Sequence, residues 1–312
     1  MALNKPPTTY AEQLDLLKGR GLVVADEPFA LHCLTHHNYY RLSAYRFTLT
    51  VRGAPDHFLP GTTFDQLWGL YCFDRQLRLL VTEAVKRLEI SVRSRWAYVL
   101  AHAHGPQAYE DATVFRDPAR HASSLAKLDE ELNRSDEMFV KHYRTKYNMN
   151  RPPIWAAAEV MSFGLLGRFY ENILRDRDRK EIARTYGLFP DTLKSLLEHS
   201  AYVRNLCAHH ARLWNRRFTV TVKLPNHQPA GVIASLNPTE DRRLCNTLVL
   251  LAHIVDTVEP QNHWAHRVRA LLHAQTVPVT SHMGFPTDWA SRPVWALRAA
   301  VPPPTSPKGG AP

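Results

Sequence analysis

The run from Phe64 to about His104 constrains the fold more than any other part of the chain, because it contains no proline and can continue as a single helix. Large apolar residues recur along it in steps of three and four, which places them on one helical face. They are Leu70, Phe73, Leu77, Val81, Val85, Leu88, Val92, Trp96 and Val99. The opposite surface carries the charged residues Arg75, Arg78, Glu83, Arg87, Glu89 and Arg93. Since Gly105 and Pro106 follow, the pattern predicts one long amphipathic helix, stabilised by i,i+4 ion pairs.

Shorter helical patterns occupy most of the remaining chain, each bounded by glycine, proline or a polar break. They cover approximately residues 10–18, 28–35, 124–147, 154–174, 177–186, 191–214, 239–258 and 262–273. Residues 218–223 alone have clear β propensity, and we expect a small hairpin or an extended linker there. The predicted fold is all-α: a helical bundle with an N-terminal helical elaboration and at most a small β hairpin.

The sequence indicates one compact domain, because no strong linker divides the middle of the chain. We expect residues 10–301 to form this domain, with the helical core at approximately 64–275. Residues 1–9 are expected to be a flexible N-terminus. Residues 302–312 are rich in proline and glycine and are expected to be a disordered tail.

The formal net charge of +10 favours binding to polyanions, above all nucleic acid, wherever the excess charge clusters. A scattered excess that serves only solubility is the alternative. The four cysteines are too widely spaced to suggest a disulfide framework or a zinc finger, and no apolar run is long enough to span a bilayer. We therefore expect a cytoplasmic protein with no membrane association, no metal site and no cofactor.

A candidate site lies in the predicted helix 191–214, at Arg204, Asn205 and His209. At about 100° per residue, Asn205 and His209 fall near one another, on a face turned away from the apolar side of that helix. The same arginine-to-histidine spacing recurs at residues 52–57 and 116–121, where glycine or proline interrupts a helix. The spacing at Arg204 and His209 is therefore more informative than these chance matches.

His210 and Arg204 lie closer to the apolar face of this helix than Asn205 and His209 do. His210 falls on the flank of the apolar face, so we expect a packed, hydrogen-bonded structural histidine. Arg204 leaves the backbone on the core side, and its guanidinium needs either a carboxylate or an anion such as phosphate. If Arg204 were paired with an internal carboxylate, the motif would be better explained as purely structural.

An arginine, an amide and an imidazole in this arrangement suit cleavage of an RNA phosphodiester without a metal. Histidine can exchange protons near neutral pH, arginine can stabilise the charge of the transition state, and Asn205 can orient the imidazole or the phosphate. One chain supplies one histidine, whereas acid–base cleavage is best served by two proton-handling groups. A second copy of the helix from another subunit would supply the other.

Several stretches of the chain resemble the Abi family of abortive-infection proteins, of the AbiD/AbiF type. Those stretches are residues 38–45, 73–78 with 87–89, 153–155 with 161–164, 204–215 and 283–286. Within them, Arg204, Asn205 and His209 resemble the arginine–histidine signature of the HEPN superfamily of helical ribonucleases. The resemblance implies a HEPN-like helical bundle and a metal-independent endoribonuclease of phage-defence or toxin–antitoxin type. It also implies completion of the site in a homodimer and restraint by a structured non-coding RNA.

Further RNA contacts are expected on both sides of the motif. Tyr40 and Arg41 combine an aromatic ring with a positive charge, which suits base stacking beside a phosphate. Packing of the tyrosines in the core with a paired Arg41 is the alternative. Arg212 and Arg216 could extend a positive track, or they could form a solvated basic helix end. A non-catalytic RNA-binding module that uses the same basic surface is the alternative to the enzyme.

Overall fold

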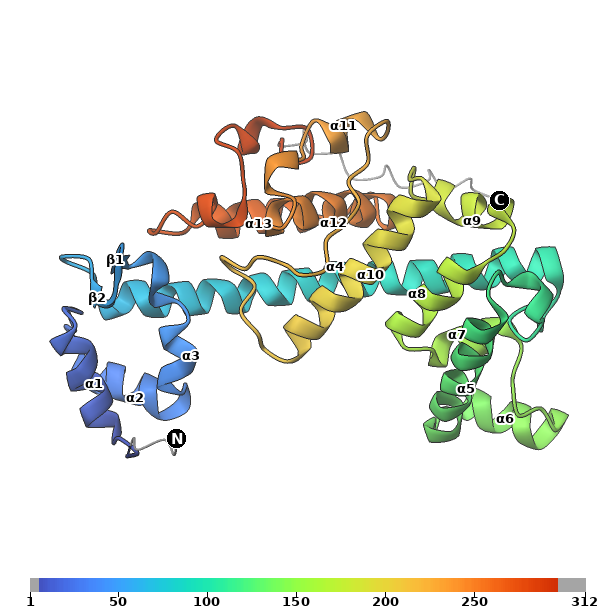
Figure 1. Ribbon diagram of the computed structural model, residues 1–312, viewed down its shortest axis with the longest axis horizontal. Helices are drawn as coiled ribbons and strands as arrows, with labels where there is room; N and C mark the ends of the chain where they lie inside the picture. Colours follow the sequence, from blue (N-terminus) through green and yellow to red (C-terminus); the bar gives the residue numbers. More distant parts are fainter. Residues whose placement is uncertain (1–5, 297–312) are drawn as a thin grey trace, which may run out of the picture.

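The computed structural model describes residues 6–296, and one long helix organises them (Figure 1). This helix, α4, spans Phe64–His104, so the prediction from the proline-free run is confirmed. Thr63 and Gln66 form a capping box at its start, and Gly105 with a φ of 91° ends it. The predicted ion pairs Glu83–Arg87 and Glu89–Arg93 both form along it, although Glu89, expected on the charged outer surface, is buried.

The core is built around α4, against which helices from the later part of the chain pack. These are α7 (Ile154–Val160), α9 (Asp176–Arg184), α10 (Pro190–Ala208), α12 (Leu244–Val258) and α13 (Trp264–His273). Of the 15 residues of α12, 11 are buried, as expected of a helix that is apolar on most sides. Shorter helical segments are α11 (Ala230–Ile233) and the 3-10 turns Arg46–Thr48, Ala112–Val114, Pro238–Glu240, Ser281–Met283 and Trp289–Ser291.

The N-terminal elaboration is confirmed and lies at one end of α4 (Figure 1). It consists of α1 (Tyr10–Gly19), α2 (Glu27–His36), α3 (Tyr39–Ser43) and a small antiparallel sheet of β1 (Thr50–Val51) and β2 (Ala54–Phe58). The chain is therefore all-α with one small hairpin, as predicted.

The position of that hairpin was not predicted. Residues 218–223 form no strand and therefore no hairpin; of the two expected structures only the linker fits, and it bends at residues 219–220. The backbone groups of this segment bond to other partners: the amide of Lys223 donates to Ser195 Oγ, and the carbonyl of Val220 lies 2.7 Å from the His199 ring. Because these groups are satisfied, the segment needs no partner strand in spite of its β propensity.

Two predicted helices are each divided into two. Residues 124–147 belong to α5 (Pro118–Arg134) and α6 (Met138–Tyr147), and residues 154–174 belong to α7 and α8 (Phe163–Asn172). Helix α5 begins earlier than predicted because Asp117 caps its first amides and Pro118 occupies its first turn.

The end of α10 also differs from the prediction. The helix was expected to reach residue 214, but it ends at Ala208 with His209 as its C-cap. His210 has a φ of 54°, its amide donates to the Cys207 carbonyl, and the amide of Ala211 donates to the Leu206 carbonyl. These are the two hydrogen bonds of a Schellman motif, with a histidine where glycine is usual.

Parts of the domain prediction lie outside the described residues, namely residues 1–5 of the N-terminal segment, residues 297–301 at the end of the predicted domain, and the whole tail 302–312. Among the helices of residues 6–296, none combines the length and the apolar character that crossing a bilayer requires.

Candidate functional site

The last turn of α10 carries the residues of the proposed motif. Asn205 and His209 are both exposed, and the His209 amide donates to the Asn205 carbonyl at 3.0 Å. His209 therefore still follows the helical path of α10, although it is the cap and not an interior residue. Within the described chain, no side chain or backbone group hydrogen-bonds the His209 ring. Its imidazole is available to an external partner.

Arg204 lies between the motif and α4. Its Nη1 is 3.3 Å from Asn205 Oδ1, and its Nη2 is 4.0 Å from Glu89 Oε1. The Arg204 side chain is 37% exposed, and Glu89 bonds more closely to Arg93 of its own helix. Arg204 thus has a carboxylate only at the outer limit of an ion pair, so its guanidinium can still bind an anion.

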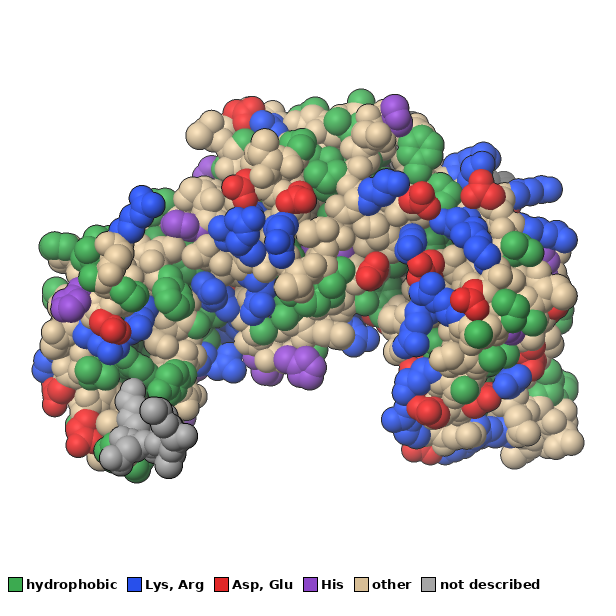
Figure 2. Space-filling view, viewed as in Figure 1, with side chains coloured by type: hydrophobic (Ala, Val, Ile, Leu, Met, Phe, Trp, Pro, Cys, Tyr) green, Lys and Arg blue, Asp and Glu red, His purple; other side chains and the backbone are tan. Residues whose placement is uncertain are grey.

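A groove of about 860 Å³ runs from Arg204 across α4 to α2 and α3, and neither Asn205 nor His209 lines it. Its lining includes the cations Arg41, Arg75, Arg78, Lys86 and Arg204 and the imidazoles of His36, His37 and His210. Glu89 is the one carboxylate that lines it. Figure 2 shows a hollow between two lobes, and Lys, Arg and His side chains gather along its roof, where Figure 1 places α4 and the end of α10.

The charge in this groove is only partly neutralised. Arg78 is buried and bonds to Asp74, whereas Arg75 and Lys86 are exposed. In residues 6–296, neither Arg75 nor Lys86 forms an ion pair. Since Glu89 is shared between Arg93 and Arg204, the groove keeps an excess of positive charge and can attract a polyanion.

Asp74 fixes the segment that follows the motif. Its Oδ1 accepts hydrogen bonds from the amides of Leu213 (3.0 Å) and Trp214 (2.7 Å), and its Oδ2 accepts from the Tyr45 hydroxyl (2.7 Å). Arg78 also donates to Oδ2. We call Asp74, Arg78 and Tyr45, together with the two amides, the Asp74 cluster. It joins three stretches on which the family resemblance rests.

The Asp74 cluster was missed in the sequence, and the expectation for Arg78 is wrong. Arg78 was placed on the charged outer surface of the long helix, but it is 6% exposed. The structure buries it because Asp74 lies one helical turn earlier and supplies the opposite charge. The signal that could have found this cluster is that Asp74, Tyr45 and Trp214 each lie in a stretch of resemblance.

Tyr40 and Arg41 both lie at the surface, Tyr40 at 71% exposure. Arg41 Nη1 donates to the His210 carbonyl at 2.9 Å and lines the groove. The alternative of core packing applies to Tyr45, which is buried, and not to Tyr40. Arg41 therefore connects the N-terminal elaboration to the turn that carries the motif.

Arg212, Arg216 and His210 differ from expectation because α10 ends early. His210 is exposed and not packed, since its left-handed backbone turns it out of the helix. Arg212 and Arg216 lie in the following loop and do not line the groove. Burial lowers the pKa of Arg212, and its Nη1 has no partner among the described residues. Arg212 and Arg216 therefore do not form a solvated basic helix end, which was the alternative to a positive track.

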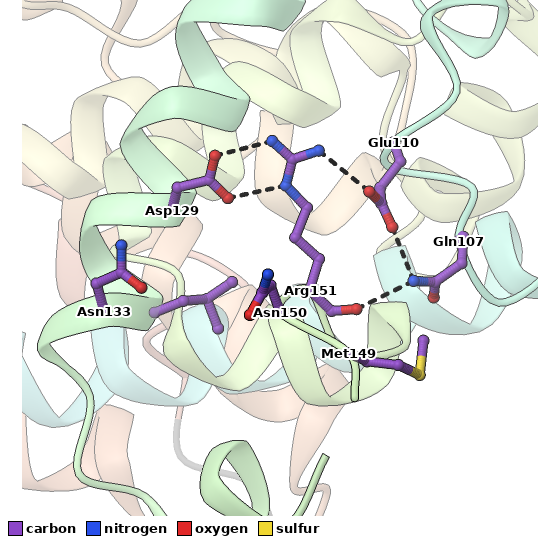
Figure 3. Close-up of a pocket in the computed structure, with 8 residues that line it drawn as sticks. Gln107, Glu110, Asp129, Asn133, Met149, Asn150 and Arg151 are labelled. Carbon is purple, nitrogen blue, oxygen red and sulfur yellow. Dashed lines mark hydrogen bonds and ion pairs between the residues drawn. The ribbon is translucent and has the colours of Figure 1, made fainter. Parts of the chain in front are cut away.

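A second cavity, of about 680 Å³, lies at the other end of α4 (Figure 3). Arg151 occupies it, with both oxygens of Asp129 at 2.8 Å and Glu110 at 3.1 Å. Hydrogen bonding to Arg151 lowers the pKa of Asp129. Gln107 donates to Glu110 and to the Arg151 carbonyl. The charged side chains that line this cavity are paired with one another. We therefore interpret their contacts as a structural network and not as a binding site.

The comparison with protein families identifies the chain. The family model described as Abi-like protein matches residues 32–215, a range that contains the groove and the motif. No curated protein and no solved structure matches the chain. Since the family match covers more than half of the sequence, the chain belongs to the Abi-like protein family.

Proposed function

We propose that the protein is a metal-independent endoribonuclease of phage-defence or toxin–antitoxin type. Membership of the Abi-like family suggests a function in abortive infection. The observation that carries the step to RNA cleavage is that Arg204 lines a groove with excess positive charge, while Asn205 and His209 are exposed at the same end of α10, outside the groove lining. RNA is the polyanion whose own 2′-hydroxyl can attack its phosphate, which requires proton transfer and charge stabilisation and no metal.

Each motif residue has a role in the proposed mechanism. The His209 imidazole exchanges a proton with the 2′-hydroxyl or with the 5′-leaving oxygen. Arg204 stabilises the negative charge that develops on the phosphate oxygens. The Asn205 amide, which contacts Arg204, orients that guanidinium or the phosphate.

A second copy of the chain completes the site in this proposal. Acid–base cleavage needs a proton acceptor and a proton donor, and each chain offers one motif histidine. In the described residues no group hydrogen-bonds the exposed His209 ring, which leaves it free to contact a second copy of the chain. A structured non-coding RNA that occupied the basic groove would restrain the activity.

The test is cleavage by the purified full-length protein in EDTA, with an RNA that has both paired and unpaired segments. We expect fragments for the wild type and none for His209→Ala. His102→Ala is the matched control, because His102 is also exposed but lies on α4 outside the groove. Equal cleavage by the wild type and His209→Ala would refute the proposal. RNA binding without cleavage by any form would favour a non-catalytic RNA-binding module.

A further inference from the structure

The N-terminal elaboration places rings as well as charges along the basic groove. His36 and His37 at the end of α2 line it, and the buried Tyr71 of α4 packs against His37. The His37 ring stands edge-on to Tyr71, with centroids 5.0 Å apart, and edge-on to Trp68 at 4.9 Å. This aromatic wall is held in place by packing and does not need a ligand to form.

An apolar side chain of α4 also lines the same groove. Leu79 lines the groove and is 66% exposed, although a leucine on a helix that packs on several sides would ordinarily be covered. It lies between Arg75 and Lys86 on one face of α4, since these residues follow at helical spacing. The groove therefore alternates positive charge with flat or apolar surface.

We infer that this groove is a binding site for the unpaired nucleotides of an RNA strand. Arg41, Arg75 and Lys86 contact phosphates, while the exposed side chains of His36 and Leu79 contact bases. Tyr71 is buried and supports this surface by packing against the His37 ring. Bases reach rings and apolar side chains only when they are unstacked, whereas a paired A-form helix presents mainly phosphates and 2′-hydroxyl groups. The volume of about 860 Å³ lies within the range of about 300–1,000 Å³ that is typical of ligand pockets.

The inference rests on the proposed function for its ligand and adds the class of RNA and the wall that recognises it. Helices α2 and α3 would guide an unpaired strand along α4 toward Arg204. Arg41 makes two contributions: it lines the groove, and it donates a hydrogen bond to the His210 carbonyl beside the motif.

Binding by the full-length His209→Ala protein tests the inference without cleavage. The probe is a short fluorescein-labelled RNA without internal pairing, measured by anisotropy over a range of salt concentrations, and the same RNA annealed to its complement. We expect the single strand to bind more tightly than the duplex. In this background, Arg75→Ala and Lys86→Ala should each make the negative slope of log K against log salt shallower by roughly 0.7, the value for one phosphate contact on a single strand.

His36→Ala should weaken binding of the single strand by roughly fivefold or more, the lower end of the range for loss of one stacking contact. The matched controls are Arg116→Ala and His102→Ala, which remove exposed side chains of the same type outside the groove. Thermal unfolding of each variant establishes that it is folded.

The inference is overturned if the groove variants bind the single strand like their controls, or if the duplex binds equally well. The cleavage and binding experiments can therefore refute the proposed function and the binding groove independently. Loss of binding in the groove variants of a protein that never cleaves RNA would support the groove and refute the proposed function. Normal binding by those variants, with cleavage that depends on His209, would refute the groove alone.

Discussion

The substitution Asp74→Ala should be among the most destabilising in the molecule. Asp74 is fully buried, and its carboxylate is the counter-ion of Arg78, which is 6% exposed. Removing one partner of a buried ion pair leaves an unpaired charge and costs about 3–5 kcal/mol. The amides of Leu213 and Trp214 also lose their acceptor, at about 1–3 kcal/mol for each buried donor without a replacement.

These contributions overlap, because they belong to one cluster and water can enter the space that the carboxylate leaves. We therefore expect a loss of about 4–6 kcal/mol in the free energy of unfolding, a large part of the 5–15 kcal/mol of an ordinary domain. The assay is urea unfolding of the full-length protein at pH 7, followed by circular dichroism.

Asp65→Ala is the control, since Asp65 is an exposed aspartate in the first turn of the same helix. It should cost less than about 1 kcal/mol. The double variant Asp74→Leu with Arg78→Leu should be more stable than Asp74→Ala, because it leaves no unpaired charge. A loss for Asp74→Ala no larger than that for Asp65→Ala would refute the account of the cluster.

Three further predictions concern single positions. His210→Gly should leave the melting temperature unchanged or raise it, because His210 has a φ of 54°, whereas the β-branched His210→Val should lower it; the reverse order would contradict the assigned turn. Gly284→Ala should lower the free energy of unfolding by about 2 kcal/mol or more, since an added Cβ would lie 2.7 Å from Arg243 Cβ at a φ of 78°; unchanged urea unfolding would show that the neighbours yield freely. Burial raises the pKa of Cys207 to about 11, so its thiol should resist iodoacetamide at pH 8 and react only as the pH approaches 11, after the more exposed Cys72. Peptide mass spectrometry that finds Cys207 labelled before Cys72 would contradict this burial.

The sequence is most informative where local spacing decides the structure. The limits of α4 follow from a regular apolar face, a capping box and a glycine, all of which are local features. The end of α10 could not be predicted in this way, because His210 adopts the left-handed conformation without a glycine or proline to indicate it.

The Asp74 cluster and the groove depend on contacts between distant residues. Asp74 and Arg78 look like surface charges on an isolated helix. They are buried because Tyr45 and the segment at Leu213 converge on them from 29 and 139 residues away. The sequence could single out Arg204, Asn205 and His209, but only the fold brings Arg75, Lys86 and His36 to the same groove.

Analysis of the RNA ends tests the central claim most directly. Wild-type protein is incubated with RNA in EDTA, and the products are examined by mass spectrometry. Attack by the 2′-hydroxyl, assisted by His209 and Arg204, predicts 2′,3′-cyclic phosphate ends that are absent with Arg204→Ala. Products that end in a 3′-hydroxyl, or cyclic phosphate ends formed equally by Arg204→Ala, would contradict it.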